Sequence, residues 1–174
     1  MPVGLFWPSL DGLRSIDAKG GTAKTIADGV FANTNIYFRI AVGAKYAVWA
    51  DNGNIFRAPR AGGESIILRS GPGTIYDVAI DGESIMLALH GSENGVYRVS
   101  IEGGTPTLVA AADGYVEGVA VGNSSVYWSD TDGGRIMGNS EVIARSSKPA
   151  RIVVDQSSLF FIDESEAMVK RIGP

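Results

Sequence analysis

The chain contains a short pattern that recurs four times without gaps, and this repeat constrains the fold more than any other feature of the sequence. Each copy has an apolar run, a polar turn of two to four residues and a second apolar run. This is the pattern of two strands joined by a hairpin. The aligned copies are FRIAVGAKYAVW (38–49), YDVAIDGESIML (76–87), EGVAVGNSSVYW (117–128) and ARIVVDQSSLFF (150–161).

The segments after each hairpin recur as well. An aromatic-x-Asp step leads into a polar turn and a third apolar strand, and in three copies a Gly-Gly turn and a fourth apolar strand follow. The 23 glycines among 174 residues fit a fold with many tight turns. The aromatic-x-Asp steps are 49–51, 128–130 and 161–163, and the Gly-Gly turns are 20–21, 62–63 and 103–104.

Four short antiparallel strands in about 40 residues are the dimensions of one propeller blade. A seven-stranded sandwich has a similar strand density, but it does not repeat one four-stranded motif in register. We therefore predict an all-β fold, a β-propeller or an open propeller arc of about five four-stranded blades, with the first and last blades incomplete. The whole chain, 1–174, is expected to be one domain. The repeats fall at about 5–35, 36–73, 74–114, 115–147 and 148–174.

Two repeats resemble a known family. Val126–Asp130 followed by Gly134–Ile136, and Val48–Asp51 followed by Gly53–Arg57, resemble the YWTD repeats of low-density-lipoprotein-receptor propellers. The stretch GGTPTLVA (103–110) is similar to repeats of bacterial YWTD-like or NHL-like propeller proteins. The resemblance implies propeller blades. It does not fix a function, because such blades occur in receptors, lyases, lactonases and scaffolds.

The ends of the repeat leave the closure of the ring open. The first copy lacks its innermost strand and the last stops after its third, which gives 18 strands in total. We expect a five-copy arc or ring. Strand 150–155 could instead complete the first copy of a four-blade ring, with 160–174 as a spare hairpin. A third possibility is an open arc that pairs with another copy as a homodimer through its edge strands, or with a missing remainder.

Positions that are constant between the copies are expected to be structural. The aromatic ring of the aromatic-x-Asp step should pack between neighbouring blades, and the Asp should cap the following turn through backbone N–H groups. A ring of metal-binding carboxylates would require these side chains to converge, which we do not expect. The residues of this structural class are Trp49, Asp51, Trp128, Asp130 and Asp163.

Positions that vary in chemistry at a constant strand are better candidates for a site. Such positions lie just before the constant core of the first strand in each copy. The resemblance implies that these strands line the central channel of a propeller and begin near one of its mouths, where ligands commonly bind. The alternative is that the charged residues neutralise one another as salt bridges. The predicted ligand-binding residues are Phe38, Arg39, Tyr76, Asp77, Glu117 and Arg151.

The sequence offers little for catalysis or metal binding. There is no Cys, and the single histidine, His90, has no neighbouring cluster of metal ligands. No nucleophile elbow, P-loop or dinucleotide motif is present. The turn 130–134 has two Asp residues at i and i+2 but lacks the later Glu of a calcium loop, so we expect a turn without metal. No cofactor is expected.

The net charge of −4 and the absence of a Lys/Arg run longer than two residues argue against nucleic-acid binding. The brief apolar stretches argue against membrane insertion. No signal peptide is visible, and the resemblance to receptor-type blades favours a secreted, periplasmic or cell-surface protein. We expect a non-enzymatic module that binds a protein, glycan or small molecule at the channel mouth. The alternatives are a propeller enzyme (a metal-dependent lactonase or hydrolase, or a lyase) and a partial propeller that self-assembles into a closed ring.

Overall fold

The computed structural model describes residues 4–9, 12–28, 38–51, 53–91, 94–155 and 157–173. These residues form eighteen strands in five separate antiparallel sheets and contain no α-helix. In this part of the chain, no helix has the length and apolar character needed to cross a membrane. The prediction of an all-β fold is confirmed.

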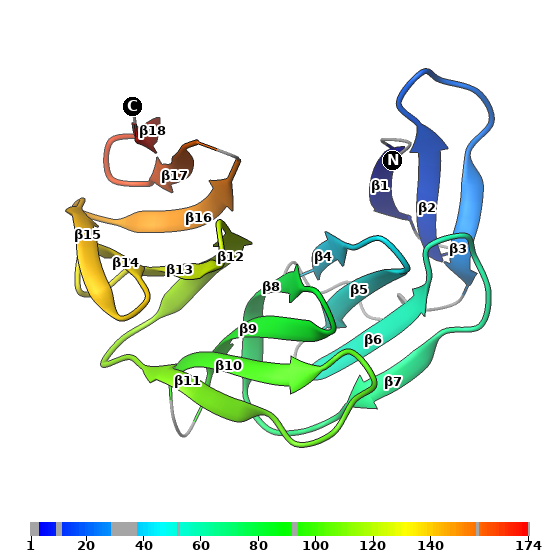
Figure 1. Ribbon diagram of the computed structural model, residues 1–174, viewed down its shortest axis with the longest axis horizontal. Helices are drawn as coiled ribbons and strands as arrows, with labels where there is room; N and C mark the ends of the chain where they lie inside the picture. Colours follow the sequence, from blue (N-terminus) through cyan, green and yellow to red (C-terminus); the bar gives the residue numbers. More distant parts are fainter. Residues whose placement is uncertain are drawn as a thin grey trace.

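The five sheets, named blade 1 to blade 5 here, follow one another along the chain (Figure 1). Blade 1 contains β1 (Gly4–Ser9), β2 (Gly12–Asp17) and β3 (Lys24–Asp28); blade 2 contains β4 (Phe38–Val42), β5 (Tyr46–Asp51), β6 (Asn54–Pro59) and β7 (Ile66–Arg69); blade 3 contains β8 (Thr74–Asp81), β9 (Ser84–His90), β10 (Gly95–Ser100) and β11 (Thr107–Ala111); blade 4 contains β12 (Val116–Gly122), β13 (Ser125–Asp130), β14 (Arg135–Gly138) and β15 (Glu141–Arg145); and blade 5 contains β16 (Pro149–Val154), β17 (Leu159–Asp163) and β18 (Met168–Ile172).

The blades stand in an open arc, with blades 1 and 5 at its two ends (Figure 1). Neighbouring blades touch through their first strands, because β4 contacts β8, β8 contacts β12, and β12 contacts β16. The open propeller arc with incomplete first and last blades is therefore confirmed. The four-blade alternative is wrong, since β16 pairs with β17 in a fifth sheet and packs on β12.

The repeat alignment is reproduced residue by residue in the hairpin registers. Four pairs that are equivalent in the alignment face each other across the first two strands of blades 2 to 5. They are Ala41 with Val48, Ala79 with Met86, Ala120 with Tyr127 and Val153 with Phe160. The Gly-Gly turns share a backbone conformation too: both residues of the pair 103–104 have positive φ, 95° and 115°, which glycine adopts without a Cβ clash.

The core of the molecule lies between the blades. Trp49 is fully buried and clusters with Leu13 and Ile26 of blade 1. Trp128 clusters with Met86 of blade 3, and Phe161 clusters with residues of blade 4. The prediction that the aromatic ring of the aromatic-x-Asp step packs between blades is confirmed, and burying each such ring removes a large apolar area from water.

In two of the three copies, at Asp130 and Asp163, the Asp of the same step caps the following turn, as predicted. Asp130 accepts a hydrogen bond from Gly133 N (2.9 Å), and Asp163 accepts one from Ser165 N (3.0 Å). Both carboxylates also bind a cation from the strand after the turn, Arg135 for Asp130 and Lys170 for Asp163. Each buried carboxylate is thereby compensated by hydrogen bonds and an opposite charge, which its desolvation requires.

Candidate functional site

Three of the four strands that open blades 2 to 5 change register near their starts. In β8 the irregularity lies at Tyr76, in β12 it covers Glu117–Gly118, and in β16 it covers Ala150–Arg151. Such bulges redirect side chains and are common next to functional sites. They fall on the positions that the repeat alignment marks as variable. The corresponding residues of β4, Phe38 and Arg39, pair regularly with β5.

The bulge in β8 leaves Tyr76 opposite no residue of β9, and its carbonyl group binds two arginines. Arg39 Nε donates to Tyr76 O at 2.6 Å, and Arg151 Nη1 donates to the same oxygen at 3.1 Å. Residues of blades 2, 3 and 5 therefore meet at one carbonyl group. The alternative prediction is that the charged residues of this region neutralise one another as salt bridges. The guanidinium groups of Arg39 and Arg151 both donate to a main-chain carbonyl group.

Asp77 holds two blades together. Its Oδ1 accepts from Val78 N at 3.0 Å, and its Oδ2 accepts from Val119 N of β12 at 3.1 Å. Burial raises the pKa of Asp77 to about 6, although both N–H groups and the charge of Arg39 act in the opposite direction. This carboxylate is thus a clamp between β8 and β12.

A cavity of about 450 Å³ opens near the starts of β8, β12 and β16, and we call it the mouth cavity. Three of the six predicted residues, Tyr76, Glu117 and Arg151, line it. Phe38 packs instead against the core cluster of blades 1 and 2, and Arg39 and Asp77 are not part of the lining. The complete lining is Tyr76, Tyr115, Glu117, Thr131, Asp132, Lys148, Arg151 and Glu164.

The turn between β13 and β14 fixes the cavity wall. Thr131 N donates to Tyr115 O at 2.9 Å, and Thr131 Oγ1 donates to Pro149 O at 2.7 Å. Asp132 Oδ2 accepts from Tyr115 N at 3.1 Å. One turn of blade 4 therefore positions the segment before β12 and the start of β16.

Two of the lining side chains, Tyr76 and Tyr115, form an aromatic cluster with His90. The Tyr115 ring stacks on His90 with 4.2 Å between ring centroids and an interplanar angle of 16°. Tyr76 stands edge-on to both rings, at 5.7 Å from Tyr115 and 6.0 Å from His90. Tyr115 is 38% exposed, so part of its ring remains available to a ligand. His90 Nδ1 is buried without a hydrogen-bond partner among the described residues.

The charges of the mouth cavity are mixed. Lys148 and Glu164 form an ion pair at 2.7 Å, and Arg151, Glu117 and Asp132 complete the charged lining. Burial raises the pKa of Glu117, and the negative charge of Glu164 acts in the same direction. The cavity offers hydrogen-bond donors and acceptors side by side, with three carboxylates and two cations in its lining.

Five residues of the cavity lining were not predicted from the sequence: Tyr115, Thr131, Asp132, Lys148 and Glu164. Tyr115 and Lys148 lie two residues before the variable pairs of their copies. Extending the repeat alignment by two residues toward the N-terminus includes them. Asp132 and Glu164 follow the aromatic-x-Asp steps, where the polar turn was assigned a structural role only. His90 lies at the end of β9, and nothing in the sequence indicates its stacking on Tyr115.

The described residues contain no group of three or more His, Asp or Glu side chains placed to hold a metal ion. In the turn that resembles a calcium loop, Asp130 accepts from Gly133 N and binds the Arg135 guanidinium group. A cation would have to displace Arg135 from this carboxylate.

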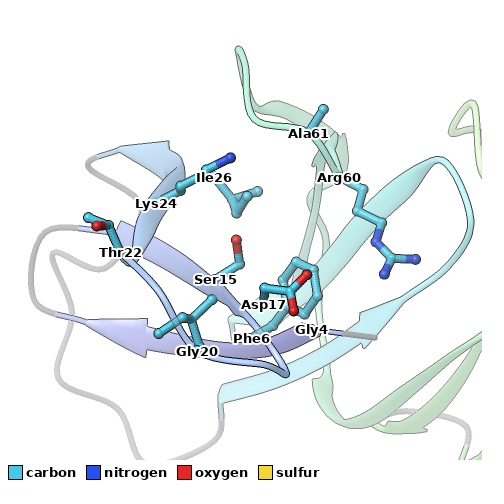
Figure 2. A pocket seen from close by; sticks show the side chains of 11 residues that line it. Gly4, Phe6, Ser15, Asp17, Gly20, Thr22, Lys24, Ile26, Arg60 and Ala61 are labelled. Atoms are coloured by element: carbon cyan, nitrogen blue, oxygen red, sulfur yellow. The ribbon is translucent and has the colours of Figure 1, made fainter. Parts of the chain in front are cut away.

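A second cavity, of about 400 Å³, lies between blade 1 and the turn after β6 (Figure 2). Figure 2 shows Phe6 and Asp17 of blade 1 on the side of the cavity that faces Arg60. The Arg60 guanidinium group lies 5.6 Å from the centroid of the Phe6 ring. A third cavity, of about 240 Å³, lies at the β4–β5 and β8–β9 hairpin turns and includes Lys45 and Glu83. Neither contains a predicted site residue.

No protein-family model matches the chain, and no curated protein matches it. Solved structures match it at the level of the fold. A chain of a nidogen/laminin complex matches with a TM-score of 0.74 and 14% identity, over 93% of this chain and 67% of that one. The WD40 β-propeller domain of Doa1 matches with 0.67 and 12%, over 98% and 61%. A gluconolactonase from Xanthomonas campestris matches with 0.62 and 17%, over 98% and 72%.

At these identities the likeness concerns the fold. It extends over nearly the whole of this chain, whereas this chain spans 61% of the WD40 propeller chain and 67% of the chain from the nidogen/laminin complex. The similar structures include a chain of a nidogen/laminin complex, a WD40 propeller domain and a gluconolactonase, so the likeness does not select one function. The protein has the β-propeller fold, in the form of an open five-bladed arc.

Proposed function

We propose that the protein is a non-enzymatic binding module with YWTD-like blades, and that its ligand binds in the mouth cavity. The proposed ligand is a neutral, hydroxyl-rich molecule of the size of a sugar, free or at the end of a glycan. One observation carries the proposal: the rings of Tyr76 and Tyr115 and five charged side chains line the same cavity of about 450 Å³.

The chemistry of the lining supports this class of ligand. Each sugar hydroxyl group both donates and accepts hydrogen bonds, and the cavity has acceptors such as Glu117 beside donors such as Arg151. The exposed part of the Tyr115 ring offers a surface for the apolar face of a sugar ring. Acidic and basic groups are nearly balanced, which disfavours a ligand of high charge.

Isothermal titration of the protein with a panel of neutral mono- and disaccharides tests the proposal. We expect at least one sugar to bind, and we expect Tyr115→Ala to weaken its binding about tenfold, a loss of about 1.4 kcal/mol. Glu117→Gln should weaken it as well, since a carboxylate acceptor is stronger than an amide. The control is Lys45→Ala, because Lys45 lies at the opposite end of the channel and is largely exposed.

Binding by none of the sugars would overturn the proposal, and so would an equal loss in Tyr115→Ala and Lys45→Ala. The enzyme alternative is separated in the same samples by metal analysis and by an assay with aldonolactones. Turnover of a lactone that depends on a bound divalent ion would favour a lactonase over a binding module.

A further inference from the structure

The internal repeat identifies the residues of each blade that contact the next blade. One equivalent register pair recurs on that face in three blades: Ala50 with Ile55 in blade 2, Ala88 with Val96 in blade 3, and Ser129 with Ile136 in blade 4. All six residues are 0% exposed, because the following blade covers them. The equivalent pair of blade 5 is Ile162 with Val169.

In blade 5 the same face is open. Val169 is 70% exposed, Ile162 is 39% exposed, and Val153, the counterpart of the buried Ala120, is 65% exposed. Phe160 lies beside Val153 in the register. Exposed singly, such residues would need no explanation, but here Ile162 and Val169 occupy positions that are 0% exposed in blades 2 to 4, and Val153 lies on the same sheet face.

The opposite end of the arc presents the complementary face. In blades 2, 3 and 5 the residue at the start of the second strand, Ala47, Ile85 or Leu159, is at most 5% exposed against the preceding blade. Its counterpart in blade 1 is Leu5, which is 64% exposed. Two residues later, at the position of Trp49, stands Trp7, which is only partly buried.

The existing blade junctions show how these two faces fit. Leu13, the blade 1 counterpart of Val169, clusters with Ala47 and Trp49 of blade 2. In the same way Ile136 of blade 4 clusters with Leu159 and Phe161 of blade 5. A junction of Val169 and its neighbours with Leu5 and Trp7 would repeat this contact with the residue types that the repeat uses.

We propose that the open face of blade 5 in one copy of this chain packs against the open face of blade 1 in a second copy. The contact is head to tail, and in the proposed dimer each copy makes it with the other, which gives a ring with two equivalent junctions. The blades join through their side-chain faces, whereas the sequence suggested pairing of edge strands. This proposal does not depend on the proposed ligand, since the mouth cavity residues take no part in the junction.

Light scattering of the purified 174-residue chain across a concentration series tests the association. We expect a species of twice the chain mass of 18.3 kDa, and we expect Val169→Glu to shift the population to single chains. The control is Ile67→Glu, because Ile67 is 60% exposed but lies on the outer strand β7, away from the junction. A wild-type chain that stays monomeric at all concentrations, or equal dissociation by both variants, would overturn the proposal.

Disulfide trapping tests the direction of the contact, because the chain has no cysteine of its own. The double variant Leu5→Cys/Val169→Cys should form cross-linked dimers on mild oxidation, whereas neither single variant should. Cross-linking by the Leu5→Cys or the Val169→Cys variant alone would show that like faces meet, and would contradict the head-to-tail junction. Tyr115→Ala should leave the mass of the particle unchanged, which separates this test from the test of ligand binding.

Discussion

At the residue scale, two buried carboxylates act in different ways. Asp163 binds Lys170 and the hydroxyl groups of Ser146 and Ser165, and these partners hold the pKa of its carboxyl group well below its usual range. Asp77 is more strongly affected by burial, which raises its pKa to about 6. The first carboxylate belongs to the repeat and caps a turn, while the second occurs in one copy only and joins two blades.

The raised pKa of Asp77 makes a prediction about pH. A carboxyl group whose pKa is higher in the folded state holds its proton more tightly there, so its stabilising effect is complete below pH 4 and is lost as the pH rises through about 6. The free energy of unfolding of the wild type minus that of Asp77→Asn should therefore fall by about 2 kcal/mol between pH 4 and pH 7. Urea denaturation of both proteins measures it.

The subtraction removes the contributions of carboxylates such as Asp163, which are present in both proteins. A difference in the free energy of unfolding that stays constant or rises over this pH range would contradict the assignment of a raised pKa to Asp77.

At the scale of elements, the sequence predicts more of the strands than of their irregularities. The eighteen strands follow from alternating apolar runs and turn residues, which are local signals. The bulges at Tyr76 and Glu117 have no such local sequence signal, because they depend on how β8 and β12 pack against neighbouring strands. The alignment marked these positions as variable, but it could not predict that the Tyr76 carbonyl group binds two arginines.

The bulge of β12 also brings two backbones close together, and this predicts the effect of a substitution. A Cβ atom on Gly118 would lie 2.9 Å from Ile152 N and 3.1 Å from Ala150 O. Gly118→Ala should therefore push β16 away from β12 and lower the free energy of unfolding by about 2 kcal/mol, as overpacking does. Thermal unfolding of the variant beside the wild type measures this loss.

Gly82→Asn is the matched control for Gly118→Ala. Gly82 has φ of 58° with no atom within 4 Å of an added Cβ, and Asn123 occupies the equivalent turn position with φ of 52°. This substitution should change stability little. A Gly118→Ala protein as stable as Gly82→Asn would contradict the close approach of β12 and β16.

At the scale of the whole molecule, the arc brings charged and aromatic side chains together near the starts of β8, β12 and β16. Of the six predicted ligand-binding residues, Tyr76, Glu117 and Arg151 line the mouth cavity, and their role in binding stays a prediction. Phe38 packs into the core between blades 1 and 2, since β4 lies next to blade 1, and this could not be predicted from the alignment alone. The contribution of Lys148 and Glu164 depends on the curvature of the arc, which brings blade 5 beside blade 4.

We propose that the ligand binds in the mouth cavity. A map of backbone amide chemical shifts in the ¹⁵N-labelled protein, during titration with the sugar that binds best in the panel, tests this most directly. We expect shifts concentrated at residues 115–117, 131–132, 148–151 and 164, with residues 43–46 and 82–83 of the hairpin turns unchanged. Shifts concentrated at 43–46 and 82–83, or spread evenly over the arc, would contradict this proposal.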